Sequence, residues 1–312
     1  MIFELPFLAP LVCALVLTPL LARVAVARGW VDGRTGALAA RKPRRAPVPP
    51  VGGVVLFVAL VVGRIAGGDE LPWLTMSLAL ALGLADDLRR GGLSAGWKFA
   101  GQGLVAAALA WETPGGPGSR ALAAFVALVA QNAVNTWDNA DGAAGGLGLV
   151  ALAPLAPAAG ALVGFLPWNL MRRERAGERV PSAYLGDAGS HLVGVLVAST
   201  PEAWPFLVLP LADLARLCVL RVSRGRAPWS ADRLHLAHRL AAAGLAPLPI
   251  ALGLAALVAL PWATTCLWPG PGGTALGVTA TLVGFLLLMV FTPELGDPVA
   301  GLGPCSPTSA GR

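Results

Sequence analysis

Charged side chains are scarce in this sequence. Only 13% of the 312 residues are charged, 17 acidic and 23 basic, whereas 56% are hydrophobic. A soluble globular chain has about 25% charged residues, which cover its surface, so this shortage excludes a soluble two-domain enzyme. The high apolar content also excludes a disordered chain. The mean hydropathy of +0.70 instead indicates an integral membrane protein.

Cysteine is also scarce. Four cysteines are too few for a disulfide scaffold. Three of them lie in apolar segments and Cys305 lies near the C-terminus, and no two have CxxC spacing. The sequence therefore gives no indication of redox chemistry or of a structural zinc site.

Long apolar segments fill most of the chain. They cover residues 5–26, 51–66, 71–85, 97–112, 121–137, 143–169, 190–222, 243–262 and 272–292. These lengths predict an all-α, polytopic integral membrane protein with about 9 to 11 transmembrane helices, some of them short or re-entrant. We expect one transmembrane catalytic domain over residues 1–292 and a short disordered tail over residues 293–312. The first run lacks a basic start and a cleavage site, so we interpret it as a retained span rather than a signal peptide.

Basic residues gather in four of the loops between these segments. The positive-inside rule places such loops on the cytoplasmic side. The loops contain Arg28, Arg34, Arg41, Lys42, Arg44 and Arg45; Arg89, Arg90 and Lys98; Arg172, Arg173, Arg175 and Arg179; and Arg221, Arg224, Arg226, Arg233 and Arg239. The connections at residues 67–70 and 113–120 carry mostly acids, glycine or proline, as expected outside.

Two apolar segments are too short for the two crossings that this topology requires. From Asp141 to Asn169 there are 28 steps, which make about 42 Å of helix, whereas two crossings need about 60 Å. Treating each segment as a single span would move the basic residues 172–179 outside. We therefore expect abbreviated hairpins that turn near Pro154 and Pro157 in the first segment and near Pro201 in the second, buried within the protein.

Asp86 and Asp87 end the third apolar segment. One interpretation is a hydrated pair at the membrane interface, neutralised by Arg89 and Arg90. Carboxylates at a helix C-terminus oppose the helix dipole, however, so a cation should compensate them. Magnesium is one such cation.

Four polar residues, Asn132, Asn135, Asp138 and Asp141, follow at intervals of three at the end of another apolar segment. Neighbours in this series are rotated by about 60° around a helix, so they share a face. A helix cap would need fewer polar residues. We therefore favour a polar binding site.

Asp187 and Ser190 lie beside Gly186 and Gly189, just before a further apolar segment. The N-terminus of a helix offers free N–H groups to an anion, and an acid there can hold a metal that bridges to phosphate. Ordinary N-capping is the alternative.

His235 and His238 lie about one helical turn apart, beside Asp232, Arg233 and Arg239. Two histidines at this spacing are half of a zinc site, but no further ligands are evident nearby. Arginine with histidine suits phosphate better. A basic helix on anionic lipid is the alternative.

In this order the motifs resemble the polyprenyl-phosphate N-acetylhexosamine-1-phosphate transferases of the glycosyltransferase 4 family, which includes the undecaprenyl-phosphate GlcNAc-1-phosphate and phospho-MurNAc-pentapeptide transferases. The ending at residues 232–240 is closer to the GlcNAc-type branch. The sequence departs from the usual pattern at Asn139, where the family has glycine, and at Ala237, where it has histidine. The matching motifs lie at residues 41–53, 86–87, 93–102, 132–146, 164–169, 185–190, 210–213 and 232–238.

The resemblance implies transfer of a sugar-1-phosphate from a UDP-N-acetylhexosamine to a polyprenyl phosphate, with release of UMP. It implies Mg²⁺, with Mn²⁺ as an alternative. Asp187 would ligate the metal, Asp86 would deprotonate the lipid phosphate, and Asp87 would support either one. Asp138 would be a further metal ligand. The residues implied in substrate binding are Lys98, Asn132, Asn135, Asp138, Asp141, Asn169, Arg233, His235 and His238. Direct transfer and transfer through a covalent aspartyl intermediate remain alternatives.

The same resemblance implies a multi-pass protein of the inner (plasma) membrane with a cytoplasmic active site, acting in cell-envelope polysaccharide or peptidoglycan synthesis. We expect no nucleic-acid partner and leave a homodimer open. A catalytically silent family member, a transporter or a scaffold is the alternative. Transporter sites lie near the bilayer midplane, whereas the ionisable residues here gather at one predicted membrane face, which favours the enzyme.

Overall fold

The computed structural model describes residues 4–32, 46–89, 91–175, 177–230 and 232–295. Several sequence predictions fall outside these residues. They concern the basic residues Arg34, Arg41, Lys42, Arg44, Arg45 and Arg90, as well as Cys305 and the tail from residue 296 onward.

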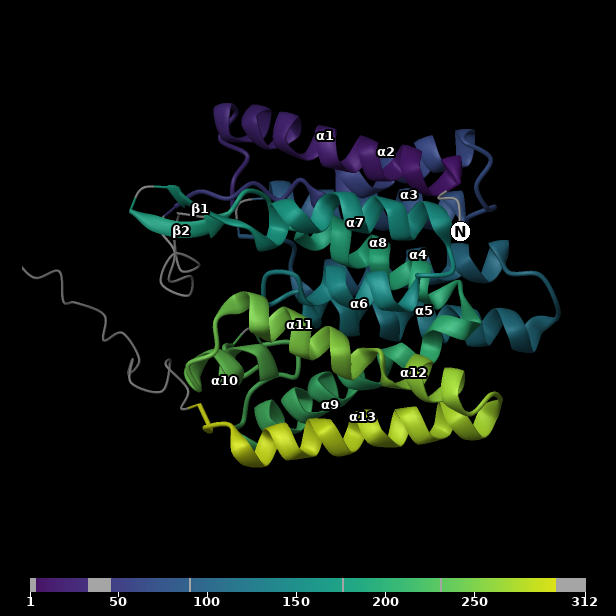
Figure 1. Ribbon diagram of the computed structural model, residues 1–312, viewed down its shortest axis with the longest axis vertical. Coiled ribbons are helices and arrows are strands. Elements are labelled where there is room, and N and C mark those ends of the chain that lie inside the picture. Colours follow the sequence, from purple (N-terminus) through teal and green to yellow (C-terminus); the bar gives the residue numbers. More distant parts are fainter. Residues whose placement is uncertain (1–3, 33–45, 90, 176, 231, 296–312) are drawn as a thin grey trace, which may run out of the picture.

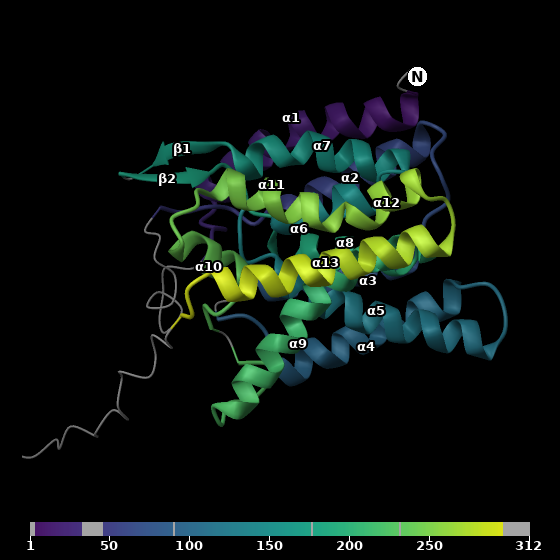
Figure 2. The same cartoon turned by 60° about the horizontal axis from the view of Figure 1, so that its bottom comes forward.

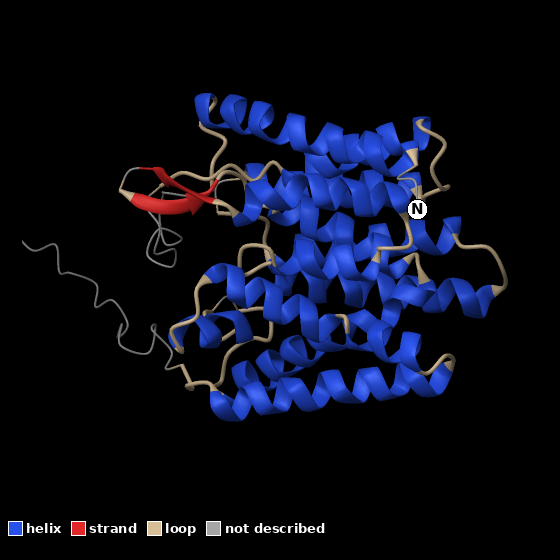
Figure 3. Cartoon of the chain, in the orientation of Figure 1, coloured by secondary structure: helices blue, strands red, loops and turns tan. Residues whose placement is uncertain are grey.

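Helices form nearly all of the regular structure in the described ranges, as the sequence predicts, and they run roughly parallel or antiparallel to one another (Figures 1 and 3). Their bounds are α1 Leu5–Ala27, α2 Gly52–Ile65, α3 Trp73–Leu88, α4 Ala95–Glu112, α5 Pro117–Trp137, α6 Ala143–Ala151, α7 Ala156–Leu170, α8 Gly186–Ala198, the 3-10 helix η2 Pro201–Leu207, α9 Val208–Ser223, α10 Leu236–Ala242, α11 Pro247–Val258, α12 Leu260–Leu267 and α13 Pro271–Phe291. Figure 2 shows α9 inclined to its neighbours.

Three helical stretches of the described chain are long and apolar enough to cross a membrane: Leu5–Ala27, Pro201–Ser223 and Pro271–Phe291. The pair α11 and α12, bent by 43°, adds a fourth if it is taken as one broken span. Large apolar side chains such as Leu5, Val219 and Phe291 are exposed on these helices, as expected for a surface that faces lipid. These features show an α-helical membrane protein, and the count of 9 to 11 spans stays a prediction.

The two short hairpins turn where the sequence predicts. The first turns between α6 and α7, which leaves Pro154 in the connection and Pro157 in the first turn of α7. The second turns between Ala198, which ends α8, and Pro201, which begins η2. Helix α8 has only 13 residues, and every one from Ala188 to Ala198 is buried. A short helix of this kind lies inside the bundle, where the protein covers its ends.

A β-hairpin occupies part of the basic connection between α7 and α8, where the sequence analysis expects a loop. Strands β1 (Arg172–Arg175) and β2 (Glu178–Pro181) are antiparallel, with Arg172 opposite Pro181 and Arg175 opposite Glu178. Gly177 in the turn has φ of 75°, which glycine adopts without strain. The hairpin projects from the same end of the molecule as α10 (Figure 1).

Glycines allow helices α2 and α3 to approach the start of α8 closely. A Cβ atom on Gly83 of α3 would overlap the backbone of Asp187 and Ala188, and one on Gly53 of α2 would overlap Ala188 and Gly189. Side chains larger than hydrogen would therefore push these helices apart. The close approach brings the C-terminus of α3 to the N-terminus of α8, and the polar site lies there.

Candidate functional site

Asp187, in the first turn of α8, lies at the centre of the polar cluster. Its Oδ2 accepts a hydrogen bond from Lys98 Nζ of α4 at 2.8 Å. Its Oδ1 accepts one from Asn135 Nδ2 of α5. The same amide of Asn135 also donates to Ser190 Oγ at 3.0 Å. Side chains from the consecutive helices α4 and α5 therefore converge on one carboxylate of α8, which is distant from them in sequence.

Lys98 joins Asp187 to a second acid. Its Nζ lies 3.3 Å from Asp86 Oδ2, at the end of α3. The other oxygen of Asp86 accepts the backbone N–H of Leu93 at 2.6 Å. The lysine thus lies between two carboxylates and neutralises part of their repulsion. Arg89, which the interfacial interpretation pairs with Asp86 and Asp87, forms no ion pair with either acid within the described ranges.

Asp87 caps helix α8 from another helix. Its Oδ1 accepts the backbone N–H of Asp187 and its Oδ2 accepts the N–H of Ala188, each at 3.0 Å. The sequence also allows capping of the N-terminus of α8 by Asp187 or Ser190 themselves. That alternative is wrong, because the cap is a residue 100 positions earlier in the chain. The negative charge of the capping carboxylate also interacts favourably with the positive end of the α8 dipole.

A pair of amides continues the cluster into the bundle. Gln102 of α4 and Asn132 of α5 hydrogen-bond each other in both directions, at 3.3 and 3.0 Å. Asn132 also donates to the carbonyl of Leu128, one turn earlier. Asn132 therefore fixes α5 against α4 and supports Asn135 one turn later, rather than pointing freely into the site.

Helix α5 ends before the polar series is complete. Trp137 is its last residue and Asp138, with φ of −74° and ψ of 36°, is the C-cap. The prediction that neighbours in the series share a helical face therefore does not apply to Asp141, which lies beyond the helix, whereas Asp138 still donates its N–H to the carbonyl of Val134. Asp138 also lies close to the other acids. Desolvation by burial, followed by the charges of Asp187 and Asp87, raises the pKa of Asp138 well above the usual range.

Asp141 lies in a second group of contacts, at the base of the β-hairpin. It forms an ion pair with Arg172 of β1. The next residue, Gly142, donates its N–H to Asn169 Oδ1 at 2.7 Å, and Asn169 Nδ2 donates to the carbonyl of Ala183 at 3.0 Å. Asn169 is buried and joins the α5–α6 turn to the segment that leads into α8.

A third group of charges surrounds His235 in the connection between α9 and α10. Asp213 of α9 is fully buried and accepts hydrogen bonds from Arg216 and from the N–H of Leu236. Asp232 accepts from Arg221 at 2.7 Å. These pairs tie the connection back onto α9. Within the described ranges, no hydrogen bond or ion pair joins this group to Asp187.

The two histidines of this third group lie against each other at the N-terminus of α10. Their ring centroids are 5.8 Å apart. Burial, and for His238 the neighbouring His235 and Arg233, lower both pKa values to about 4. The nearest carboxylate oxygens to His235, on Asp213 and Asp232, are 3.9 Å from its ring nitrogens, too far for hydrogen bonds. Both imidazoles are therefore neutral near pH 7.

Sequence reasoning missed three polar residues that the structure places in these groups. Arg216 and Arg221 hold the acids of the third group, and a single sequence gives no signal that distinguishes them from other basic residues at a helix end. His191 follows Asp187 by one turn of α8, is 0% exposed, and neither ring nitrogen has a partner in the described structure. A histidine inside an apolar helix is the signal that could have identified it.

The donor set at Asp187 can be tested for its fit to a divalent cation. The available donors are carboxylate and amide oxygens, which suit Mg²⁺. In the described part of the chain, no three acid, histidine or cysteine side chains form a group that could hold a metal by themselves. Magnesium is usually bound through one or two carboxylates together with substrate phosphates and water. The oxygen donors of the cluster therefore suit Mg²⁺ only together with further ligands, such as phosphate oxygens or water.

The segment that contains this cluster also matches known proteins. Residues 71–201 match glycosyl transferase family 4. The resemblance to this family is confirmed. The matched segment runs from α3 to η2. It therefore includes Asp86, Asp87, Lys98, Asn135 and Asp187, whereas the third group, around His235, lies beyond it.

Individual proteins to which the chain is similar are named as polyprenyl-phosphate N-acetylglucosamine phosphotransferases. The chain is 32% identical to a decaprenyl-phosphate N-acetylglucosaminephosphotransferase of Mycobacterium leprae, over 26% of this chain and 25% of that protein. It is also 32% identical to the protein of the same name from Mycobacterium tuberculosis H37Rv, over 26% of this chain and 24% of that protein. An undecaprenyl-phosphate alpha-N-acetylglucosaminyl 1-phosphate transferase of Haemophilus influenzae is 34% identical over 20% of this chain and 21% of its own. The chain thus spans about a quarter of the length of the curated relatives it matches.

Proposed function

We propose that this protein transfers a sugar-1-phosphate, from a UDP-N-acetylhexosamine, to a polyprenyl phosphate at the cytoplasmic face of the plasma membrane. The observation that carries the proposal is the convergence of Asp86, Lys98 and Asn135 on Asp187, inside the segment that matches the family. The names of the relatives support a polyprenyl phosphate as the acceptor.

The position of the cluster suits a lipid substrate and a soluble substrate together. Asp86 and Asp187 lie in terminal turns of two helices of an apolar bundle. The β-hairpin and α10 project from the end of the bundle at which α7 ends and α8 begins (Figure 1). Basic residues of the hairpin favour the cytoplasmic side by the positive-inside rule. A phosphate carried on a polyprenyl chain could reach this end from the bilayer while a nucleotide enters from the water.

The proposed reaction exchanges one phosphoanhydride linkage for another. An oxygen of the lipid phosphate forms a bond to the phosphorus that carries the sugar. The bond between that phosphorus and the oxygen bridging to the uridine-bearing phosphate breaks, and UMP leaves with the electron pair. The product is a polyprenyl diphosphate sugar. Positioning and neutralisation of charge supply most of the catalysis in such transfers.

The residues of the cluster divide these tasks in the proposal. Asp86, at the rim, accepts the proton of the lipid phosphate. Lys98 lies between two acids in the structure and is close enough to pair with phosphate oxygens when substrate arrives. Asp87 holds the start of α8 in place through its two backbone contacts, so we assign it a positioning role in addition to any support of a metal.

Asp187 is the proposed principal ligand of Mg²⁺, with Asp138 beside it. When bound, the cation would neutralise charge on the diphosphate. Desolvation by burial, followed by the charges of the neighbouring acids, raises the pKa of Asp138, and a cation would offset the repulsion among those acids.

The proposal assigns the second and third groups to the nucleotide and the phosphates. Asn169 and Asp141 shape the turn after α5, beside the basic hairpin. Arg233 lies in the connection before α10, His235 is the N-cap of that helix and His238 lies in its first turn. All three can donate hydrogen bonds to phosphate oxygens.

The experiment is a transfer assay on the purified chain in lipid nanodiscs with UDP-GlcNAc, a polyprenyl phosphate and Mg²⁺. Wild type should form lipid-linked sugar phosphate and release UMP. Asp187→Asn should lose turnover by at least about a hundredfold, since electrostatic groups of this kind contribute that much. Asp69→Asn is the matched control, because Asp69 is exposed in the connection between α2 and α3, away from the cluster. Absence of product with several UDP-sugars would instead support a silent or transporting family member.

A further inference from the structure

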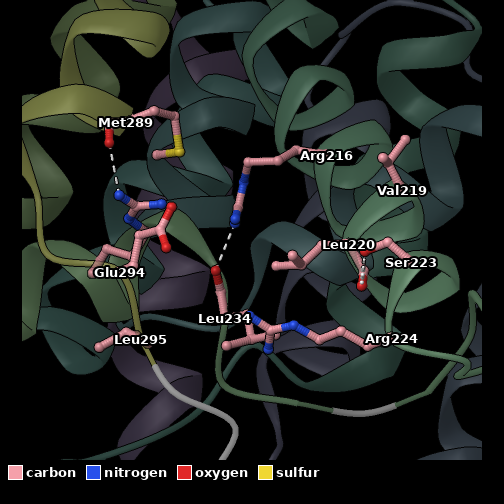
Figure 4. Close-up of a pocket in the computed structure, with 10 residues that line it drawn as sticks. Arg216, Val219, Leu220, Ser223, Arg224, Leu234, Met289, Glu294 and Leu295 are labelled. Atoms are coloured by element: carbon pink, nitrogen blue, oxygen red, sulfur yellow. Dashed lines mark hydrogen bonds between the residues drawn. The ribbon is translucent and has the colours of Figure 1, made fainter.

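A cavity of about 440 Å³ lies beside the ends of α9 and α13, outside the Asp187 cluster. Figure 4 shows its wall, with Arg216 and Arg224 on the α9 side and Met289 and Glu294 on the α13 side. Arg239 of α10 completes the basic lining. Three arginines and one glutamate give the lining a formal net charge of +2.

Two of these arginines are held rigidly and still have hydrogen atoms to donate. Arg216 uses Nε and Nη2 for Asp213 and the carbonyl of Leu234. Arg239 uses Nε and Nη2 for Thr292 and the carbonyl of Met289. None of the hydrogen bonds within the described ranges uses Nη1 of either residue. A guanidinium fixed in this way loses little freedom when it binds an additional anion.

Arg224 supplies a third and more mobile charge. It is the C-cap of α9 and its side chain is exposed. It forms no ion pair with any residue that the structure describes. Positive groups at a helix C-terminus are favoured by the dipole, but that effect explains one charge and not three around one cavity.

The rest of the lining identifies the occupant as an amphiphile rather than a soluble anion. Val219, one turn before the end of α9, and Met289, two residues before the end of α13, are both apolar. Both helices belong to stretches that can cross a membrane, so their ends lie at the depth of lipid headgroups. Val219 is 70% exposed and offers a surface to an acyl chain.

We propose that this cavity binds the phosphate headgroup of an anionic phospholipid, with its acyl chains along α9. The headgroup lies between Arg216, Arg224 and Arg239, and joins the ends of α9, α10 and α13. The site adds a lipid contact that the transfer reaction does not require, and it can be tested without any sugar nucleotide.

The test uses native mass spectrometry. The full chain is mixed in detergent with either dioleoyl-phosphatidylglycerol or dioleoyl-phosphatidylcholine, and the lipid that stays bound after release from the detergent is measured. We expect tighter retention of phosphatidylglycerol. Arg224→Gln should weaken that retention about fivefold, because one basic residue near a membrane surface contributes about that factor. Val219→Trp keeps the charge but fills the cavity, and it should also reduce retention. Arg120→Gln is the matched control, because Arg120 is an exposed arginine near the N-terminus of α5.

Three results would overturn the proposal. The first is equal retention of the two lipids by wild type. The second is a loss in Arg120→Gln as large as that in Arg224→Gln, which would indicate general surface charge. The third is displacement of the lipid by excess soluble glycerophosphate, which would identify a site for a soluble anion. The transfer assay is independent of all three, so failure here leaves the proposed reaction unaffected.

Discussion

Replacing Asp87 by alanine should destabilise the protein as well as inactivate it. Each oxygen of Asp87 accepts one backbone N–H from the first turn of α8, both at 3.0 Å. A hydrogen bond to a charged group contributes about 1.5 to 3 kcal/mol, and loss of an N-cap costs about 0.5 to 2 kcal/mol. Because the two bonds share one carboxylate, they do not add fully. We expect a loss of about 2 to 4 kcal/mol in the free energy of unfolding.

That loss corresponds to a fall in Tm of about 3 to 6 °C for a chain of this size. The assay is intrinsic tryptophan fluorescence during thermal unfolding in nanodiscs. Asp87→Asn keeps one acceptor oxygen and should lose about half as much. Asp187→Asn should abolish transfer with a much smaller change in Tm, because its side chain caps no helix. Asp69→Ala controls for the loss of an exposed acid.

A different pattern would refute this reasoning. If Asp87→Ala kept the Tm of wild type and lost only activity, the carboxylate would act on substrate or metal and not as a cap. If Asp87→Ala kept both, neither role would hold.

Three further predictions test other parts of the structure. Gly83→Val should prevent the close approach of α3 to α8, because its Cβ would overlap the backbone at Ala188; we expect a large drop in the yield of folded protein, and normal yield and Tm would contradict the packing. Burial lowers the pKa values of His235 and His238 to about 4, from 6.5 when unfolded. Between these pH values the folded state binds fewer protons than the unfolded chain, so stability should fall as the pH is lowered from 6.5 toward 4. In the double variant His235→Asn, His238→Asn the slope of Tm against pH should be shallower, and an unchanged slope would show that other groups titrate. His191→Leu should raise Tm, since an unpaired buried polar group costs about 1 to 3 kcal/mol; a lower Tm would show that the imidazole has a partner in the folded protein.

Much of this fold could be predicted from the sequence, because the bilayer restricts both the composition and the length of the helices that cross it. The apolar segments correspond to helices. That two segments form short hairpins follows from length arithmetic, since a helix of fixed rise cannot cross twice in too few residues, and the prolines indicate where they turn. The β-hairpin at residues 172–181 could not be predicted, because its alternating charged residues give no apolar face for a pattern to detect.

The residues that form the site could be predicted, but the contacts between them could not. Asp86 and Asp187 could be singled out as acids at the ends of apolar segments and Asn135 by the regular spacing of its polar series, whereas Lys98 follows only from the resemblance to the family. The assignment of Asp87 to the N-terminus of α8 depends on how two helices pack, which no local pattern encodes. The close packing itself depends on glycines, and Gly83 looks in sequence like any other glycine of an apolar helix.

The measurement that tests the central claim most directly follows the phosphorus atom next to the sugar. UDP-GlcNAc labelled with ³²P at that position is incubated with the purified chain, a polyprenyl phosphate and Mg²⁺. Transfer of a sugar-1-phosphate predicts that the label moves to the lipid, with one unlabelled UMP released for each labelled lipid. Label that stays with the nucleotide as UDP would show transfer of the sugar alone. That result, or no transfer to lipid at all, would contradict the proposed function.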